Sequence, residues 1–231
     1  MKKIAVLAVL LQISCSRNEI EPRHAFLVGE ATDRSGNKLS GVQIIIDNSL
    51  LFNQHLSTIT NEEGQYSLEI PVGSWYAFAK FSKHYHGQAY QLYLHPENTA
   101  GFGREGGKRN FTWMLTGQRP APLTGNYGGL ITFDHSVGTY IDESKIEVSL
   151  TPITPLIDGS MGKKITCNLL EEAVLHDIPL GRYRLQLSYE GKPLSLRKWN
   201  TQDPYQQEIS FDFDPLVPGQ CTNCFKIEYH N

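Results

Sequence analysis

Two histidines separated by one residue, His84 and His86, form the sharpest chemical pattern in the chain. If this segment is extended, both imidazoles point to the same side and could chelate a metal ion, with His95 or Glu97 as a further ligand. The surrounding sequence, His84-Tyr-His-Gly-Gln88, is also typical of a solvated loop, and a metal site needs three or four ligands. We therefore predict no metal and no other cofactor, with His84 and His86 as weak candidates only.

Aromatic side chains are concentrated between residues 85 and 113. Exposed aromatic rings stack on sugars in many binding modules, and they also mark protein interfaces. The candidate ligand-binding residues are Tyr85, Tyr90, Tyr93, Phe102 and Trp113. The alternative is that much of this set fills the core, because Phe111 and Trp113 fall on one face of one strand. The glycine-rich segment 98–108 would be a loop beside them.

The chain has four cysteines. Cys221 and Cys224 follow Pro218-Gly219 and precede a strand-like run, so we expect a structural disulfide rather than the redox pair that usually opens a helix. A bond from one of them to Cys167 stays open. A zinc site would need further ligands besides Cys221 and Cys224, and the only clear candidates are Cys167 and His230.

Catalytic motifs are missing from the sequence. Ser160-Met-Gly-Lys163 has the spacing of serine acyl-transfer enzymes, but Gly159 and Gly162 disfavour the required helix, and the partner motifs do not occur. We predict no catalytic residues and a protein that is not an enzyme. The formal net charge of −3, without basic runs, argues against nucleic acid as a partner.

The elements that would position these residues are strands. Short runs rich in Val, Ile, Tyr and Phe recur about every 8–12 residues between Gly, Pro, Asn and Asp, as in β-sandwiches. Residues 182–189 alternate most clearly, with Tyr183, Leu185, Leu187 and Tyr189 on one face. Tyr66 is expected to pack inward with its hydroxyl bonded to nearby backbone. The fold class is therefore predicted to be all-β, built from Greek-key β-sandwiches.

One phrase occurs twice. Ile70-Pro-Val-Gly-Ser-Trp75 corresponds to Ile178-Pro-Leu-Gly-Arg-Tyr183, at an offset of 108 residues (178 − 70). This offset is the usual size of a small domain. We expect two tandem sandwich domains, residues 26–117 and 127–231, joined by a proline-containing linker at 118–126.

The amino end has the pattern of an export signal. Lys2 and Lys3 precede an apolar run from Ile4 to Ile13 that only Gln12 interrupts. Ten residues of helix span about 15 Å, half of a bilayer core, so the run is too short to cross a membrane.

The run ends in Ile13-Ser14-Cys15, which resembles the lipobox of bacterial lipoproteins. Gln12 departs from that pattern, where a small or branched residue is more usual. The resemblance implies that residues 1–14 are a removable signal peptide, that Cys15 is lipidated, and that residues 15–25 are a tether. Acyl chains contribute about 0.8 kcal/mol per buried CH₂, which would hold the protein on a membrane.

Residues 26–82 contain an ordered set of short motifs. They are Val28-Gly29, Asp33, Gly36, Leu39-Ser-Gly41-Val42, Thr60 to Leu68, and Ile70-Pro-x-Gly73. This order resembles the carboxypeptidase regulatory-like domains, which are transthyretin-like sandwiches grouped with carbohydrate-binding-like folds. The second half is similar only around residues 146–187. The resemblance implies an exported protein of Bacteroidetes-type bacteria and supplies no catalytic residues.

These patterns lead to one expected function and one alternative. We expect a non-enzymatic protein of the cell envelope, lipid-anchored at the outer membrane, that acts as a binding or assembly module for a protein partner. The alternative is a surface glycan-binding accessory protein that uses the aromatic residues of 85–113. Whether it faces the periplasm or the cell exterior is left open.

Overall fold

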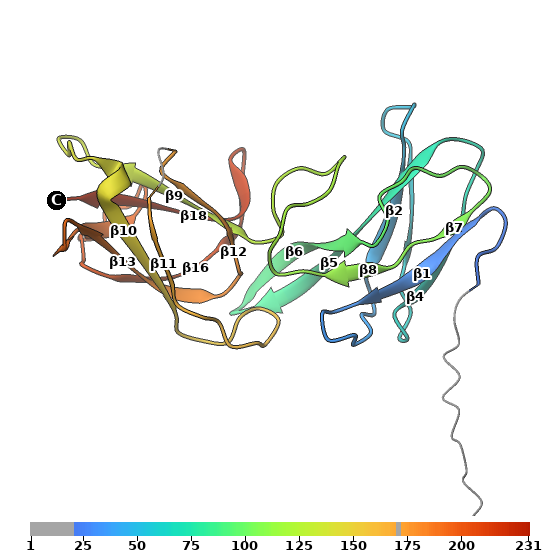
Figure 1. The fold of residues 1–231 in the computed structure, drawn as a ribbon, viewed down its shortest axis with the longest axis horizontal. Helices are drawn as coiled ribbons and strands as arrows, with labels where there is room; N and C mark the ends of the chain where they lie inside the picture. Colours follow the sequence, from blue (N-terminus) through green and yellow to red (C-terminus); the bar gives the residue numbers. More distant parts are fainter. Residues whose placement is uncertain (1–20, 170–171) are drawn as a thin grey trace, which may run out of the picture.

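The computed structural model describes residues 21–169 and 172–231. Within these ranges the chain is folded as strands, and the one helical segment is a short 3₁₀ turn, η1 (Glu143–Lys145). The all-β sandwich prediction is confirmed at this level (Figure 1). The predicted signal peptide and Cys15 lie outside the described residues. No helix of the described residues is long and apolar enough to span a bilayer.

The first half contains eight strands, of which seven follow one hydrogen-bonded path, β3-β2-β5-β6-β8-β1-β4, and the eighth, β7, pairs with β1. The strands are β1 (Phe26–Thr32), β2 (Gln43–Asn48), β3 (His55–Ile59), β4 (Gln65–Glu69), β5 (Trp75–Tyr85), β6 (Gln88–Pro96), β7 (Gly107–Lys108) and β8 (Phe111–Trp113). Strand β6 pairs with both β5 and β8. It thereby connects the layer that contains β2 to the layer that contains β1.

The second half forms two five-stranded sheets, β11-β10-β13-β14 with β16 on β13, and β12-β9-β18-β15 with β17 on β18. The strands are β9 (Gly129–His135), β10 (Ile146–Pro152), β11 (Ile165–Asn168), β12 (Val174–Ile178), β13 (Arg182–Tyr189), β14 (Lys192–Pro193), β15 (Ser195–Lys198), β16 (Ile209–Asp212), β17 (Asp214–Val217) and β18 (Cys221–His230). The alternation predicted for 182–189 is observed, since Tyr183, Leu185 and Leu187 are all buried.

The two halves repeat one pairing scheme. Strand β1 is antiparallel to β4 and parallel to β8, and β9 is likewise antiparallel to β12 and parallel to β18. Strand β2 is antiparallel to β3 and β5, as β10 is to β11 and β13. Equivalent strands therefore follow one another in the same order along the chain in both halves, and they pair with equivalent partners in the same direction.

The repeated Pro-x-Gly phrase makes the same contact twice. The Trp75 indole N–H donates to the carbonyl of Pro71 at 3.1 Å, and the Tyr183 hydroxyl donates to the carbonyl of Pro179 at 2.8 Å. Both aromatic side chains are buried. In each half the ring thus satisfies the carbonyl four residues before it while filling the core.

Tyr66 packs inward as predicted, and its hydroxyl donates to the carbonyl of Arg109 at 2.7 Å. Burial raises the pKa of this phenol well above its usual value of 10. The same carbonyl explains Gly29, because a Cβ there would lie 1.9 Å from the Arg109 oxygen. Only glycine allows the backbone of β1 to approach so closely.

Candidate functional site: the junction between the two halves

The hairpin of β5 and β6 contacts the second half of the chain through Tyr85, His86 and Tyr90. Tyr85 pairs with Gln88, so His86 and Gly87 alone form the turn. Both have positive φ, 47° and 79°, which is the type I′ pattern that matches the twist of a hairpin. The segment expected as a solvated loop is therefore mostly strand with a two-residue turn.

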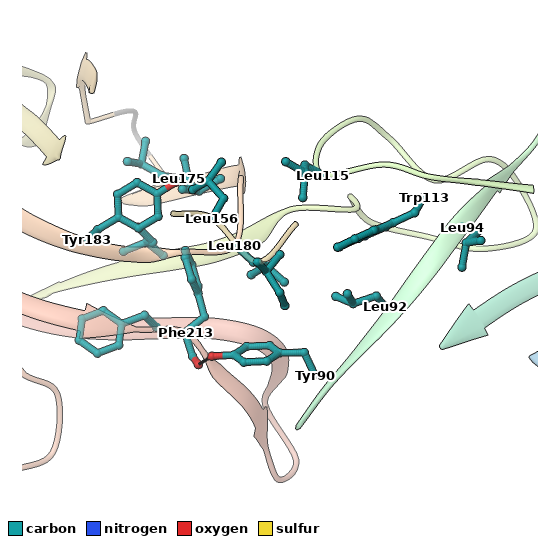
Figure 2. Close-up of a cluster of buried hydrophobic side chains, with 14 of the residues drawn as sticks. Tyr90, Leu92, Leu94, Trp113, Leu115, Leu156, Leu175, Leu180, Tyr183 and Phe213 are labelled. Carbon is teal, nitrogen blue, oxygen red and sulfur yellow. Dashed lines mark hydrogen bonds between the residues drawn. The ribbon is translucent and has the colours of Figure 1, made fainter. Parts of the chain in front are cut away.

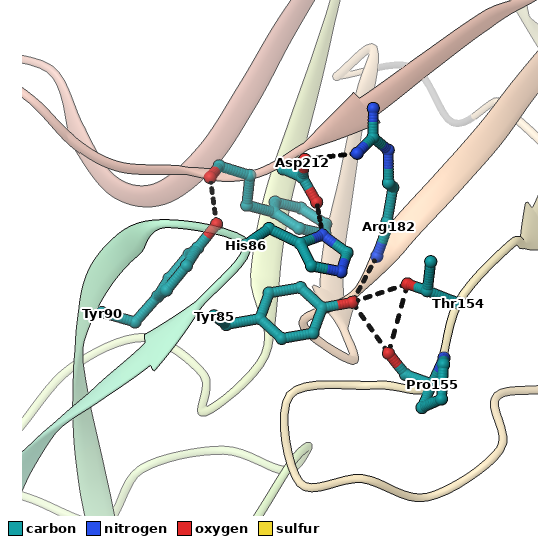
Figure 3. A network of polar contacts seen from close by, with 8 residues as sticks. Tyr85, His86, Tyr90, Thr154, Pro155, Arg182 and Asp212 are labelled. Carbon is teal, nitrogen blue, oxygen red and sulfur yellow. Dashed lines mark hydrogen bonds and ion pairs between the residues drawn. The ribbon is translucent and has the colours of Figure 1, made fainter.

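The Tyr85 hydroxyl is held by the second half. It donates its proton to the carbonyl of Pro155 at 2.8 Å and accepts the backbone N–H of Arg182 at 3.1 Å. The hydroxyl of Thr154 lies 2.9 Å away (Figure 3). These contacts join residues about 70 to 97 positions apart in the sequence, and they fix the tip of the hairpin in place.

His86 continues this network. Its Nδ1 lies 2.7 Å from a carboxylate oxygen of Asp212, and the other oxygen is 3.7 Å from a guanidinium nitrogen of Arg182 (Figure 3). The His86 ring stacks on Tyr85, with 4.0 Å between centroids. His84 is exposed on β5. Across residues 21–169 and 172–231, no three His, Cys, Asp or Glu side chains are grouped as metal ligands.

Tyr90 crosses the junction from β6. Its side chain is only 1% exposed, and its hydroxyl donates to the carbonyl of Phe213 at 2.6 Å (Figure 3). Burial raises the pKa of Tyr90 above its usual value, so the phenol stays a neutral donor.

One hydrophobic cluster runs through the junction. Figure 2 shows its members from the first half facing those from the second half, and all are buried. Those from the first half are Tyr90, Leu92, Leu94, Trp113 and Leu115, and those from the second are Leu156, Leu175, Leu180, Tyr183 and Phe213. The two halves therefore share apolar contact as well as hydrogen bonds.

The expectation of an exposed aromatic platform is wrong for three of its five residues. Tyr90, Phe102 and Trp113 are at most 6% exposed and belong to the core. Trp113 packs edge-on against Phe81, with 5.1 Å between ring centroids. Tyr85 is held in the junction by its hydrogen bonds, and Tyr93 lines a cleft between the two halves.

The segment expected as a linker is a closed loop. Gln118 forms a β-bridge with Asn126, and the N–H of Tyr127 donates to the carbonyl of Gly117 at 2.9 Å. The carboxylate of Asp177 accepts the N–H groups of Gly117 and Gly128, at 2.6 and 3.0 Å. Because the two ends of the loop meet, the chain passes from one half to the other at a single clamped point.

A cleft of about 250 Å³ lies beside this loop and is lined by both halves. Its lining includes Gln91, Tyr93, Arg119, Asn126, Tyr127, His176 and Asn223. The Arg119 guanidinium lies 4.8 Å from the centre of the Tyr93 ring. Burial raises the pKa of Tyr127 to about 12, and its hydroxyl lies 3.1 Å from Nδ1 of His95.

Two buried polar atoms of the cleft residues have no hydrogen-bond partner among the described residues: Nε of Arg119, a donor, and Oδ1 of Asn223, an acceptor. Each of these two atoms is almost inaccessible to solvent, so neither indicates a ligand in the open cleft. The residues that line the cleft include Gln91, Asn126 and His176, whose side chains can hydrogen-bond a small hydroxyl-bearing ligand. Tyr93 is the one cleft residue that the aromatic pattern pointed to, because the other lining residues come from separate segments of the chain.

Cys221 and Cys224 are joined by a disulfide within β18, with 6.1 Å between their Cα atoms. Cys167 is half-buried and unpaired within the described part of the chain, and burial raises its thiol pKa.

No protein-family model matches the chain, and no curated protein matches it. Among solved structures, the Bacillus anthracis TIE protein is similar at 12% identity and a TM-score of 0.34, with 90% of this chain and 34% of that chain covered. A streptococcal ancillary pilin is similar at 11% identity and a TM-score of 0.27, with 88% and 62% covered. The major pilin subunit of Bacillus cereus is similar at 9% identity and a TM-score of 0.26, with 90% and 99% covered.

This chain thus spans about a third of the first of these structures and less than two thirds of the second. All three TM-scores lie below 0.5, and none of these proteins assigns a function to this chain.

Proposed function

We propose that this chain is a non-enzymatic, lipid-anchored protein of the cell envelope, located at the outer membrane, that acts as a binding or assembly module. The observation that carries the proposal is the junction. Tyr85, His86 and Tyr90, which belong to the histidine- and aromatic-rich segment singled out in the sequence, form contacts between the two halves of the chain. The export leader, the lipobox-like Cys15 and the missing catalytic motifs support the same proposal.

The two halves are, in this proposal, tandem domains of the carboxypeptidase regulatory-like kind, residues 26–117 and 127–231. The repeated pairing scheme supports this interpretation. So does the aromatic-to-proline contact that occurs once in each half. Within such a duplicated chain, strand order and turn chemistry would be inherited together.

In this proposal the two halves keep a fixed arrangement, and this rigidity favours the binding of a partner. Domains within one chain move relative to each other unless their interface is large and hydrophobic. Here the interface combines a shared apolar cluster with the bonds of Tyr85, His86 and Tyr90. Loops on both units would then be presented to a partner at a fixed separation, which lowers the entropic cost of binding.

Glycan binding is the second candidate, and the cleft between the halves is the observation that favours it. The cleft has a volume of about 250 Å³, and Gln91, Asn126 and His176 among its lining residues can hydrogen-bond the hydroxyl groups of a sugar. Tyr93 supplies the aromatic ring.

Replacing Tyr93 with alanine should weaken any glycan binding about tenfold, which corresponds to about 1.4 kcal/mol. A glycan array followed by titration calorimetry of the selected sugar measures the effect. Tyr140→Ala, at a tyrosine that is 90% exposed in the second half, is the matched control and should bind as the parent does. If the parent chain binds no glycan, or if both variants bind equally, the cleft is not a sugar site.

The envelope proposal is tested by cell fractionation of the full-length protein together with labelling by a palmitate analogue. We expect the labelled protein in the membrane fraction and its release by detergent but not by high salt, because acyl chains rather than charges would hold it. An unlabelled protein that salt extracts would refute the anchor.

A further inference from the structure

The tip of the β2–β3 hairpin exposes three large apolar residues in succession. Leu50 is 79% exposed, Leu51 is 56% exposed, and Phe52 is fully exposed. Val72, on the turn between β4 and β5, is 77% exposed. Single exposed apolar residues are ordinary, but a run of three on one loop is unfavourable in water unless it has a binding role.

The apolar tip, Leu50 to Phe52, is an ordered loop. The Asn48 side-chain oxygen accepts the N–H groups of Leu50 and Leu51 at 2.9 and 3.0 Å, and the Asn48 N–H donates to the carbonyl of Gln54 at 2.9 Å. Residues 48–54 contain no charged side chain. The tip can therefore enter a lipid headgroup layer without desolvating a charge.

The apolar tip lies near the start of the folded chain. The N–H of Ile70 donates to the carbonyl of Ala25 at 2.8 Å, which ties the chain start to the turn that carries Val72. The end of that turn is bonded to the base of the tip, because the N–H of Ser49 donates to the carbonyl of Ser74 at 2.8 Å. Figure 1 shows the β2–β3 hairpin projecting at the top of the first half, while the first described residues lie at the right-hand edge, on the side away from the second half.

We propose that the apolar tip, with Val72 beside it, inserts into the surface of the membrane that holds the lipid anchor. This inference rests on the proposed lipidation of Cys15. Ala25 lies ten positions after Cys15, and even a fully extended segment of this length spans only about 35 Å, so the anchor would keep the start of the folded chain close to the bilayer. Covalent attachment raises the local concentration of the tip at the membrane, and a few inserted side chains then suffice to orient the protein.

The place of the apolar tip in the first half, which the tether enters, favours a membrane rather than a protein as its binding partner. A partner protein could approach an apolar tip anywhere on the molecule, whereas a bilayer contact must lie within reach of the tether. The base of the apolar tip is linked to the start of the folded chain through the turn that carries Val72, which places the tip on the half of the molecule that the tether enters.

The test measures sedimentation with vesicles of phosphatidylethanolamine and phosphatidylglycerol, using the mature chain that the proposal implies, residues 15–231, with Cys15→Ala, so that neither the apolar leader nor an acyl chain contributes. The variant Leu50→Ser, Leu51→Ser and Phe52→Ser should bind at least about tenfold more weakly than its parent. The matched control is Val137→Ser with Tyr140→Ser, which removes side chains that are 105% and 90% exposed on the loop after β9. That loop adjoins the carboxyl end through the N–H of Ser136 and the carbonyl of Tyr229, so the control should bind as the parent does.

Equal vesicle binding by the parent and the tip variant would overturn the inference, as would a parent that binds no vesicles. A concentration-dependent dimer that the tip variant loses, without vesicle binding by the parent, would show a second copy as the occupant and also overturn it. Acyl labelling of the unmodified chain reports on Cys15 alone, so failure of the anchor and failure of the tip are separate results. Circular dichroism checks that the variants are folded.

Discussion

Replacing Tyr90 with alanine is expected to lower the free energy of unfolding by about 3–5 kcal/mol, the range found for large aromatic residues removed from a core. Tyr90 is 1% exposed, so its removal leaves a cavity in the cluster between the halves. It also removes the donor that satisfies the carbonyl of Phe213. Urea denaturation followed by both fluorescence and circular dichroism measures the effect. The parent should unfold in one transition, and the variant should show separate transitions for the two halves.

Two controls separate the sources of this loss. Tyr90→Phe keeps the ring and removes only the hydroxyl, and it should cost about 1–3 kcal/mol because the Phe213 carbonyl is left unpaired. Tyr140→Ala, at a residue that is 90% exposed, should change stability by no more than about 0.5 kcal/mol. A loss below about 1 kcal/mol for Tyr90→Ala would mean that the junction contributes little to the fold.

Replacing Cys15 with alanine is expected to abolish acyl labelling and to move nearly all of the protein out of the membrane-bound pool. The contributions of the buried CH₂ groups to membrane binding add, at about 0.8 kcal/mol each. One acyl chain therefore gives only marginal binding, whereas two or more hold nearly all of the protein on the bilayer. The apolar tip alone would give weak, reversible binding. Metabolic labelling with a palmitate analogue and membrane fractionation measure both effects.

Cys167→Ala is the matched control for this experiment, because it removes the unpaired thiol of the described chain and leaves the leader intact. It should be labelled and fractionate as the parent does. If Cys15→Ala is labelled as strongly as the parent, the lipobox interpretation is wrong.

The strands could be predicted from the sequence because their signals are local. The alternation of Tyr183, Leu185 and Leu187 reports directly which face of β13 is buried. The inward packing of Tyr66 was predictable because a tyrosine on a core-facing position must find an acceptor for its hydroxyl. The recurring Pro-x-Gly phrase likewise pointed to a recurring contact.

The junction could not be predicted, because it depends on how the two halves dock. Tyr90 lies on a strand that also reads as a core strand of a single sandwich, and its partner Phe213 is 123 residues away. His86 looked like a loop residue because a type I′ turn more often contains Asn-Gly than His-Gly. The ends of 118–126 meet through backbone bonds, which leave no signature in side-chain types.

The central claim is that the junction holds the two halves as one rigid unit, and a spin-label distance measurement tests it most directly. Labels are placed through Glu62→Cys and Lys192→Cys, at exposed sites of the two halves, in a chain with Cys15→Ala and Cys167→Ala. Pulsed electron–electron double resonance should give one narrow distance distribution, which broadens when Tyr85→Ala and Tyr90→Ala are added. A broad distribution in the chain with an intact junction, or one that these two substitutions leave unchanged, would contradict the account.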